Sequence, residues 1–189
     1  HVKHELEEIK NCPLCGGEEI LSYIKCVDHN FSGEVFNVDS CVSCNFKFTN
    51  PRPSEKTVYK YYQSDNYISH TSSKKGLFNT IYHAVRNYQF KKKYSIINSL
   101  TTKDEKTILD VGCGTGEFLN YFKEKKWLTK GVETDKKARE HAIEKYNCSV
   151  DDKIDKIIKS GEKFDVITLW HVLEHVYDFK NYLYKLKGM

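Results

Sequence analysis

The sequence contains no apolar run long enough to cross a membrane. Charged residues make up 30% of its 189 residues and the mean hydropathy is −0.63, whereas a spanning helix needs roughly 18 or more consecutive apolar residues. Residues 1–10 alternate charges with single apolar residues, so they also lack the apolar core of a secretory signal. These absences predict a globular, cytoplasmic protein that makes no contact with a membrane and works in a reducing compartment.

Proline is scarce, and two of the three prolines lie close together. Pro51 and Pro53 disfavour both regular helix and central strand, and they restrict the residues that precede them. The chain has no internal repeat and no low-complexity run, so the two prolines and the motifs are used to divide it into parts. It also lacks an initiator methionine, from which we expect it to begin inside a longer protein. The predicted parts are residues 1–54, 55–104 and 105–189.

Seven cysteines are present, and four of them form two CxxC pairs. In a short secreted protein this count would indicate disulfides, but without a secretory signal a metal site is the better interpretation. Two residues between thiolates let both sulfurs reach one ion from a tight turn, and two such turns complete a tetrahedron. We predict structural Zn²⁺, because four thiolates leave no open coordination position; iron or free structural cysteines are the alternatives. The predicted metal ligands are Cys12, Cys15, Cys41 and Cys44.

Residues 1–54 have further features of a small zinc-ribbon-like β module. Gly16 and Gly17 follow the first cysteine pair and suit a sharp knuckle, and residues 23–27 and 33–38 have the composition of a β-hairpin. This part carries five Lys or Arg against eight acids. Because an RNA reader should concentrate positive charge, the acidic balance favours a structural or substrate-side role and makes a nucleic-acid partner the weaker hypothesis.

Residues 55–104 are interpreted as a tyrosine-rich segment followed by linker helices. Four tyrosines lie between residues 59 and 67, as packing groups or as a wall of a binding site. Apolar residues then recur at helical spacing, and the phase shifts near Gln89, which predicts one long helix with a break or two short helices. Nine basic residues against three acids indicate either a phosphate-binding surface or, as we favour, a solvated helix face.

Residues 105–189 alternate short apolar strands with amphipathic helices. This alternation is typical of βαβ units, so the predicted fold class is α/β with a Rossmann-like parallel sheet. The predicted strands are Thr107–Val111, Leu128–Glu133, Cys148–Val150 and Phe164–Trp170, and the predicted helices are 117–125, 135–146, 154–160 and 178–187.

The most informative segment joins the first of these strands to the first helix through Gly112, Gly114 and Gly116. Glycines at such a junction allow a tight turn and let a ligand approach the backbone. A dinucleotide site would have a glycine where Glu117 stands, and a carboxylate there would repel two phosphates. A P-loop is excluded because no Gly-Lys-Ser/Thr follows. S-adenosylmethionine, which carries a sulfonium and an ammonium, tolerates the carboxylate.

An acid stands at the end of the second predicted strand. Glu133 follows Gly112 by 21 residues, and an acid at this place can accept hydrogen bonds from both hydroxyls of a ribose. The alternative is a surface glutamate at a strand terminus. We favour ribose binding because of the glycine loop upstream.

Three segments together resemble the successive motifs of class I S-adenosylmethionine-dependent methyltransferases. They read Asp110-Val-Gly-Cys-Gly-Thr-Gly116, Gly131-Val-Glu133 and Phe164-Asp-Val-Ile-Thr-Leu-Trp-His-Val-Leu-Glu-His175. The resemblance covers residues 107–178. The whole chain, with its CxxC pairs and Pro-Arg-Pro, resembles bacterial methyltransferases that bear an N-terminal zinc-binding domain, some of which act on nucleotide-linked sugars.

The resemblance implies which residues bind the cofactor. In that family the glycine loop holds the methionine end, the acid after the second strand binds ribose, and a residue after the third strand contacts adenine. Asp151 is taken for this last role, with Asp152 as the alternative. The implied cofactor-binding residues are Asp110, Gly112, Cys113, Gly114, Gly116, Glu133, Asp151, Trp170 and His171.

The resemblance also implies a catalytic pair after the fourth strand. Sugar C-methyltransferases of this kind use a Glu-His pair there, which corresponds to Glu174 and His175, while the tyrosine that accompanies the pair is Val172 here. Methyl transfer mainly requires positioning and removal of a proton, so His175 is the predicted base, with Glu174 orienting it or sharing its role. The alternative is that His171 and His175 only cap or pack the loop.

The family sheet has seven strands in the order 3-2-1-4-5-7-6, and this chain supplies the first four. We therefore expect a C-terminally truncated chain that is inactive alone. Its fourth strand would be an unpaired sheet edge, available for homodimerisation.

The sequence thus predicts S-adenosylmethionine-dependent methyl transfer to a small molecule, with a nucleotide-linked sugar as the candidate acceptor. The alternative is an rRNA base methyltransferase that binds RNA through the zinc module and Lys91–Lys93. A third hypothesis is a scaffold that retains the cofactor fold without chemistry.

Overall fold

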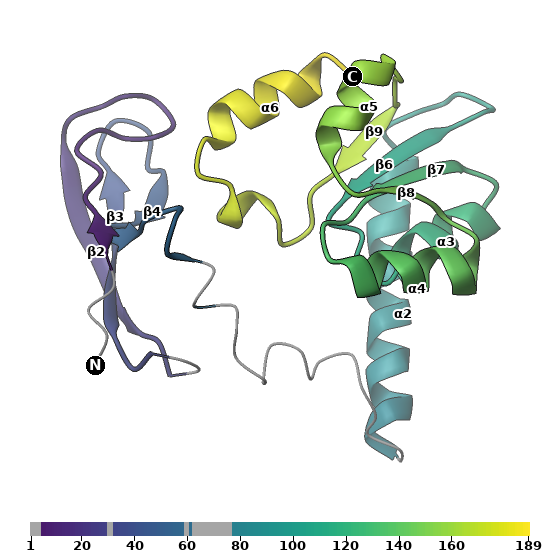
Figure 1. Ribbon diagram of the computed structural model, residues 1–189, viewed down its shortest axis with the longest axis horizontal. Helices are drawn as coiled ribbons and strands as arrows, with labels where there is room; N and C mark the ends of the chain where they lie inside the picture. The colour runs from purple at the N-terminus through teal and green to yellow at the C-terminus, as the bar shows by residue number, and fades with distance from the viewer. Residues whose placement is uncertain (1–4, 30–31, 59–60, 62–76) are drawn as a thin grey trace. The chain divides into compact units, whose positions relative to one another are not determined.

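The computed structural model describes residues 5–29, 32–58, 61 and 77–189, which belong to two compact units (Figure 1). The first unit is His1–Ser73 and the second is Lys74–Met189. Among the described residues, none of the helices combines the length and the apolar content that crossing a bilayer requires.

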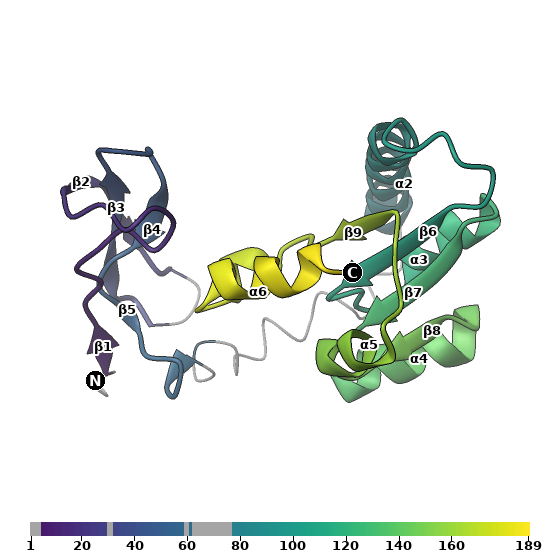
Figure 2. The same cartoon turned by 90° about the horizontal axis from the view of Figure 1, so that it is seen from above.

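The first unit consists of antiparallel β-strands, several of them very short. One sheet has the order β2-β3-β4, and a separate pair joins β1 to β5 (Figure 2). The hairpin of β2 and β3 is the one that the β-rich composition predicts. The strands are β1 (Leu6–Glu7), β2 (Ile20–Val27), β3 (Val35–Cys41), β4 (Lys47–Thr49) and β5 (Arg52–Pro53).

Asn50 ties the beginning of the chain to this sheet. Its Oδ1 accepts a hydrogen bond from the Ile9 backbone N–H at 2.8 Å, and its Nδ2 donates to the Ile9 carbonyl at 3.1 Å and to Asp39 at 2.9 Å. The residue is only 8% exposed, and a buried amide is stabilising when its donors and acceptor are satisfied in this way. Asn50 therefore fixes the segment that leads into the first cysteine pair.

Tyr61 packs against the β2–β3 hairpin. Its ring meets that of Phe36 edge-on, with centroids 6.0 Å apart, and its hydroxyl donates to Glu34 at 2.6 Å. Burial raises the pKa of the Tyr61 phenol, and the adjacent Glu34 raises it further. The other members of the predicted tyrosine cluster, Tyr59, Tyr62 and Tyr67, lie outside the described residues.

The second unit contains a four-stranded parallel sheet with the order β8-β7-β6-β9. Helices connect its strands, which confirms the predicted α/β class. The strands are β6 (Thr107–Val111), β7 (Leu128–Val132), β8 (Ser149–Asp151) and β9 (Val166–Thr168). The helices are α2 (Leu77–Asn98), α3 (Glu117–Glu124), α4 (Lys136–Tyr146), α5 (Ile154–Ser160), η3 (Leu173–His175) and α6 (Phe179–Lys187).

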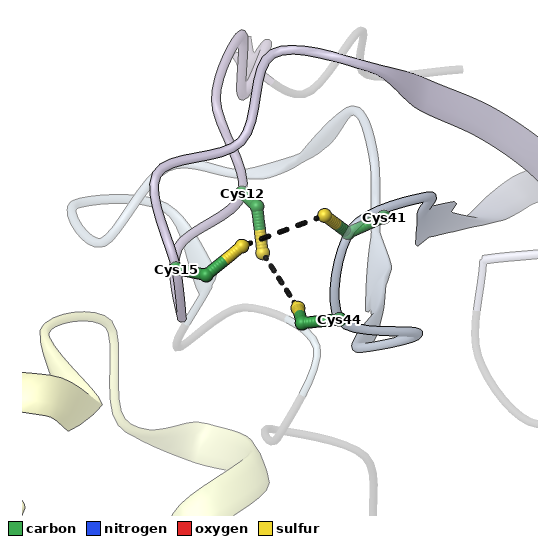
Figure 3. Close-up of side chains that lie close together, drawn as sticks. All are labelled: Cys12, Cys15, Cys41 and Cys44. Carbon is green, nitrogen blue, oxygen red and sulfur yellow. Dashed lines mark hydrogen bonds between the residues drawn. The ribbon is translucent and has the colours of Figure 1, made fainter.

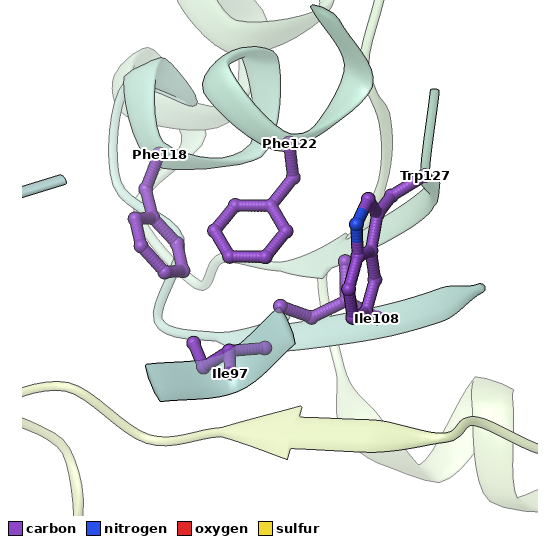
Figure 4. Packing of buried hydrophobic residues seen from close by; sticks show 5 residues of the cluster. All are labelled: Ile97, Ile108, Phe118, Phe122 and Trp127. Carbon is purple, nitrogen blue, oxygen red and sulfur yellow. The ribbon is translucent and has the colours of Figure 1, made fainter. Parts of the chain in front are cut away.

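Apolar clusters cover both faces of β6. On one face Ile108 contacts residues of α2 and α3, and the rings of Phe122 and Trp127 meet edge-on at 5.2 Å (Figure 4). Because side chains alternate along a strand, Leu109 and Val111 point to the other face. This first cluster consists of Ile97, Ile108, Phe118, Phe122 and Trp127, and the second of Leu109, Val111, Val132 and Ile157. These clusters fix the carboxyl end of β6, where the glycine loop begins.

The break predicted near Gln89 is wrong, because α2 is one uninterrupted helix. The shift in its apolar stripe has another cause. Val85 and Tyr88 are 54% and 55% exposed, whereas Phe90 and Tyr94 pack on the core cluster. The phase shift therefore marks where the helix face leaves the core.

The fourth strand is shorter than the predicted Phe164–Trp170. Within the part of the chain that the structure describes, β9 pairs only with β6, over Ile108–Asp110. Just before it, the Asp165 carboxylate accepts hydrogen bonds from the N–H and the hydroxyl of Thr107, both at 2.9 Å. Hydrogen bonds to the Asp165 side chain thus replace the backbone hydrogen bonds between strands at the beginning of β9. The remaining boundaries predicted between residues 105 and 189 agree with the structure to within one residue at each end, whereas β2 begins three residues before the predicted 23–27 and β3 is shifted by two to three residues from the predicted 33–38.

Candidate cofactor site and cysteine cluster

Four cysteine sulfurs gather in the first unit (Figure 3). The Sγ atoms of Cys12, Cys15, Cys41 and Cys44 all lie within 4.8 Å of one another, and those of the pairs 12–44 and 15–41 are 3.6 Å apart. A tetrahedral ion with metal–sulfur distances of about 2.3 Å holds its sulfurs about 3.8 Å apart. The spacing of the four sulfurs is therefore compatible with a tetrahedral metal site.

Two backbone turns of the same design present these sulfurs. In both turns the N–H of the first cysteine donates to the carbonyl five residues later, at 2.8 and 3.0 Å. The Gly16 N–H donates to the Cys12 carbonyl at 2.8 Å, and the Asn45 N–H donates to the Cys41 carbonyl at 2.9 Å. Gly16 and Asn45 have φ of 80° and 59°, a left-handed conformation that glycine and asparagine adopt most readily. The repeated turn explains why the two CxxC pairs face each other.

The surroundings of the sulfurs favour thiolate at one position. Burial raises the pKa of the Cys41 thiol, but the backbone N–H groups of Cys44 and Ser43 and the neighbouring thiols outweigh it and lower the pKa to about 7. The Phe46 N–H lowers the pKa of Cys44, yet burial and the three other thiols raise it to about 12. Thiolate is the form that binds metal. A cation among the sulfurs would offset the repulsion between neighbouring thiolates.

In the second unit, the loop after β6 contains three glycines with left-handed backbone. Gly112, Gly114 and Gly116 have φ of 73°, 55° and 84°, and each meets a different environment. A Cβ on Gly112 would lie 2.4 Å from Val172 Cγ2, and one on Gly116 would lie 2.7 Å from the Ala142 Cβ. A Cβ on Gly114 would meet nothing within 4 Å. Packing thus fixes the two ends of the loop, while its middle borders open space.

Glu133 holds the middle of this loop. Its Oε2 accepts a hydrogen bond from the Gly114 N–H at 2.8 Å, and its Oε1 accepts one from the Asp135 N–H at 2.8 Å. The Glu133 N–H donates to the Asp151 carbonyl at 2.9 Å, which extends the β7–β8 pairing. The carboxylate is therefore fixed at the end of β7, directly beside the open side of the loop.

Asp110, at the end of β6, is buried, with 3% exposure. Burial raises its pKa to about 7, even though the Thr168 hydroxyl donates to it at 2.6 Å and Lys93 attracts its charge. Burial also lowers the pKa of Lys93, whose Nζ lies 3.8 Å from the ring centroid of Trp170. A carboxyl, a lysine and an indole thus surround the base of the loop.

The side chain of Cys113 points away from the open side. It packs in a buried cluster with Leu119, Ala142 and Cys148, and burial raises the pKa of its thiol. Only the backbone of Cys113 can therefore face a ligand at the loop.

Glu117, at the beginning of α3, is paired with a cation. Arg86 of α2 lies 3.3 Å from its Oε1, and the Thr115 hydroxyl donates to the same carboxylate. This pairing weakens the charge argument that the sequence suggested for Glu117. Glu133 and Asp110 are two further acids that border the loop.

The segment after β9 contains the predicted catalytic residues. His171 has φ of 58°, and its Nδ1 lies 3.5 Å from Glu174 Oε1. Glu174 and His175 belong to η3 and are exposed, while Trp170 is 39% exposed. The structure therefore brings the Glu174 carboxylate to His171, one helical turn earlier in the sequence.

Two adjacent acids follow the third strand. Asp151 is the last residue of β8, and its Oδ2 is 3.0 Å from Lys130 Nζ. Asp152 lies beyond the strand and pairs with Lys156 at 2.7 Å, which lowers the pKa of Asp152. Both acids lie at the carboxyl edge of the sheet, with Asp152 one residue farther out.

A protein-family model described as "Methyltransferase domain" matches residues 82–188, more than half of the chain. The chain belongs to this methyltransferase family. The match includes the whole parallel sheet, the glycine loop and the segment after β9. No curated protein sequence matches the chain.

Solved methyltransferase structures are similar to parts of this chain. Magnesium protoporphyrin IX methyltransferase from Synechocystis PCC 6803, with bound SAM, is 17% identical at a TM-score of 0.50, and the match covers 73% of each chain. Plantazolicin methyltransferase BpumL is 22% identical with a TM-score of 0.46, over 54% of this chain and 41% of that one. A SAM-dependent methyltransferase from Archaeoglobus fulgidus is 25% identical with a TM-score of 0.42, over 53% and 44%. The chain thus spans less than half the length of the plantazolicin enzyme.

Three residues that contact the candidate cofactor site were not among the site residues predicted from the sequence. Thr168 is an ordinary strand residue in the sequence, and Lys93 is one of three consecutive lysines. Val172 was noted only because related sugar C-methyltransferases have a tyrosine at the corresponding position. Each of them meets the site through tertiary contacts with a distant part of the chain, and no local motif marks such contacts. The one usable signal was the position of Thr168 and Val172 near the carboxyl end of the fourth strand, where α/β sheets bind their ligands.

Proposed function

We propose that this methyltransferase chain binds S-adenosylmethionine and serves methyl transfer to a small molecule. The observation that carries the proposal is the Gly114 environment. Its left-handed backbone borders open space, and its N–H is held by the carboxylate of Glu133. A loop built in this way leaves room for a ligand against its backbone and presents an acid beside it.

The donor set suits the chemistry of this cofactor. The ribose would bind Glu133, whose oxygens keep lone pairs free after accepting one hydrogen bond each. The ammonium of the methionine end would lie near Asp110 and the loop at Gly112. Adenine would lie beyond β8, near Asp151 or Asp152. When bound, S-adenosylmethionine supplies a methyl group that is already activated by its sulfonium.

The chain's own residues would orient the reaction after β9. Trp170 and His171 would border the cofactor, and His175 would take the proton of an acceptor, with Glu174 sharing or orienting that role. His175 is exposed, so an acceptor could reach it. We propose a nucleotide-linked sugar as the acceptor because of the sequence resemblance, and the acidic first unit argues against RNA.

Calorimetric titration with S-adenosylhomocysteine tests cofactor binding directly. The chain should bind it, and Glu133→Ala should weaken binding at least ten-fold, about 1.4 kcal/mol. Glu140→Ala is the matched control, because Glu140 is an exposed acid on α4 that pairs with its helix neighbour Lys136. Absence of binding to the unsubstituted chain would refute the proposal. Equal losses in both variants would show that Glu133 has no special role.

We further propose that the cysteine cluster holds one structural Zn²⁺. Four sulfurs in tetrahedral spacing leave no position for a substrate or water, so the ion would stabilise the short strands of the first unit. Gly17 supports this dense packing, since a Cβ there would lie 3.2 Å from Cys41 Sγ.

Metal analysis of two serine variants tests the zinc site. The unsubstituted chain should contain about one zinc ion, and Cys41→Ser should lose it. Cys26→Ser should keep the metal, because Cys26 is an exposed cysteine outside the cluster. Full zinc content in Cys41→Ser would contradict the proposed ligand set.

A further inference from the structure

The segment after β9 is packed directly onto the glycine loop through Val172. The Cγ2 methyl of Val172 occupies the place where a side chain of residue 112 would be, 2.4 Å from an ideal Cβ there. Gly112 is the first residue after β6, and Val172 lies between the predicted cofactor contacts and the predicted catalytic pair. The contact therefore joins two parts of the candidate site that are 60 positions apart in the sequence.

Two backbone hydrogen bonds tie Gly112 and its neighbour to the end of β7. Its N–H donates to the Val132 carbonyl at 2.7 Å, and the following N–H of Cys113 donates to the same carbonyl at 3.0 Å. The loop is thus bound to the end of β7 and contacted by Val172 at Gly112. A shift of Val172 has to be transmitted either to the loop or to the segment that carries Val172.

That segment is itself fixed at Val172. The Val172 carbonyl accepts the His175 N–H at 2.9 Å, which closes the η3 turn, and its side chain packs on the buried cluster that contains Leu109 and Val111. On the other side, His171 has a left-handed backbone that L residues rarely adopt. Val172 is therefore the anchored residue between two exposed histidines.

We infer that Val172 is a positioning residue that couples the cofactor loop to the segment bearing Glu174 and His175. The inference rests on the proposed cofactor binding and deepens it. When the loop binds its ligand, the packed contact at Gly112 holds the segment in one arrangement, and when the contact is removed, the loop and the segment move independently. Loss of the contact should therefore weaken cofactor binding even though Val172 need not touch the cofactor.

The experiment compares Val172→Ala with Val176→Ala. Both variants remove the same two methyl groups from half-buried positions of one segment, but only Val172 contacts Gly112. S-adenosylhomocysteine affinity should fall about five- to ten-fold in Val172→Ala and less than two-fold in Val176→Ala. Val172→Thr, which keeps two heavy atoms on Cβ and so fills the same space against Gly112, should restore affinity. Hydrogen exchange should show that ligand protects residues 171–176 in the unsubstituted chain and no longer does so in Val172→Ala.

A double-mutant cycle with Gly112→Ala identifies the contact itself. Gly112→Ala alone should lower affinity strongly, because the new methyl collides with Val172 and strains a positive φ. In the double variant the collision is gone, since Val172 Cβ would be 3.8 Å from the new Cβ, so the combined loss should be clearly smaller than the product of the single losses. The strain at φ is the same in both backgrounds and cancels.

The outcomes separate the inference from the proposed function. If the unsubstituted chain does not bind S-adenosylhomocysteine, the proposed function fails and the inference fails with it. If it binds, but Val172→Ala matches Val176→Ala or the cycle is additive, the inference alone is overturned. Should Val172→Ala not fold, the unsubstituted chain still decides, because ligand protection confined to residues 112–116 overturns the coupling.

Discussion

At the scale of single residues, each of the three glycines in the candidate cofactor loop is a glycine for a different physical reason. Gly116 allows close approach of α4, Gly112 allows close approach of Val172, and Gly114 leaves open space above the backbone. All three have positive φ, so an alanine costs about 1 to 2 kcal/mol at each through backbone strain alone. What differs is the neighbour that the new methyl group meets.

This difference predicts opposite phenotypes for two alanine substitutions. Gly114→Ala should fold with only the loss due to strain, but its methyl would enter the proposed ligand space and lower S-adenosylhomocysteine affinity at least ten-fold. Gly116→Ala should be the less stable variant, by about a further 1 to 3 kcal/mol. The reason is that its new methyl group would lie 2.7 Å from the Cβ and 3.1 Å from the Cα of Ala142. Thermal unfolding and calorimetry measure both. Normal affinity in Gly114→Ala would contradict the proposed ligand position.

Asp165 gives a prediction about pH. Hydrogen bonds from Lys103 and from the Thr107 N–H lower its pKa to about 2, below the ordinary 3.8. A carboxyl with a lowered pKa contributes stability that is present above the unfolded pKa and lost as the pH falls through the folded value. The unsubstituted chain should therefore lose stability between about pH 4 and pH 2 through this group.

Asp165→Asn should lack that acid-dependent component and be about 1 to 2 kcal/mol less stable at pH 7. Asp104→Asn is the control, since Asp104 is an exposed acid shortly before β6, the strand that Asp165 binds through Thr107. Denaturant unfolding at several pH values measures the difference. Parallel pH profiles for Asp165→Asn and the unsubstituted chain would show that the carboxylate does not hold β9 to β6.

The sequence made some site residues predictable and left others hidden. Glycines, the Glu133 acid and the cysteine pairs stand in local motifs whose spacing reflects backbone geometry. Lys93 and Thr168 reach Asp110 from elements far away in the sequence, so no local pattern marks them. Glu117 was noticed, but Arg86 lies 31 positions earlier, and its compensating charge could not be foreseen.

At the scale of elements, boundaries were predicted well where the sequence contains a local helix-capping residue. Helix α5 ends at the residue before Gly161, which has φ of 74°, and α4 begins after Asp135, whose side chain accepts the Ala138 N–H. Glycine at the end and aspartate at the beginning are local signals, and both helices were predicted closely. The continuity of α2 and the shortness of β9 depend on packing partners instead, which the sequence does not name.

The way in which α2 packs yields a matched pair of substitutions. Ile97 is 4% exposed in the cluster with Phe122 and Trp127, whereas its neighbour Ile96 is 64% exposed. Ile97→Ala should cost about 2 to 5 kcal/mol, because it leaves a cavity in a packed core. Ile96→Ala should change stability by no more than about 0.5 kcal/mol.

Denaturant unfolding of these two variants tests whether α2 belongs to the core of the second unit. The two side chains are identical and adjacent, so helix propensity changes equally in both. Similar stabilities would mean that α2 does not pack on α3 as described, and the position of Lys93 near Asp110 would lose its support.

At the scale of the whole molecule, the two units depend on different sources of stability. The first unit has short strands and few buried apolar side chains, with Cys12 and Cys41 as its buried apolar residues among those described. A unit of this kind needs a metal or another crosslink to remain folded. The second unit has three apolar clusters around a parallel sheet, which form a core of its own.

This difference predicts two thermal transitions that respond to different ligands. S-adenosylhomocysteine at about 100 times its Kd should stabilise the second unit by about 2.7 kcal/mol, which raises its Tm by about 10 °C, and should leave the first unit unchanged. A strong chelator should abolish the transition of the first unit, because metal-binding free energy is folding free energy there. Calorimetry on the chain, with Cys41→Ser as the metal-free control and Glu133→Ala as the control for the cofactor, assigns each transition. A single transition that moves with both ligands would show that the two units unfold together, and then the zinc site would contribute to the stability of the methyltransferase fold itself.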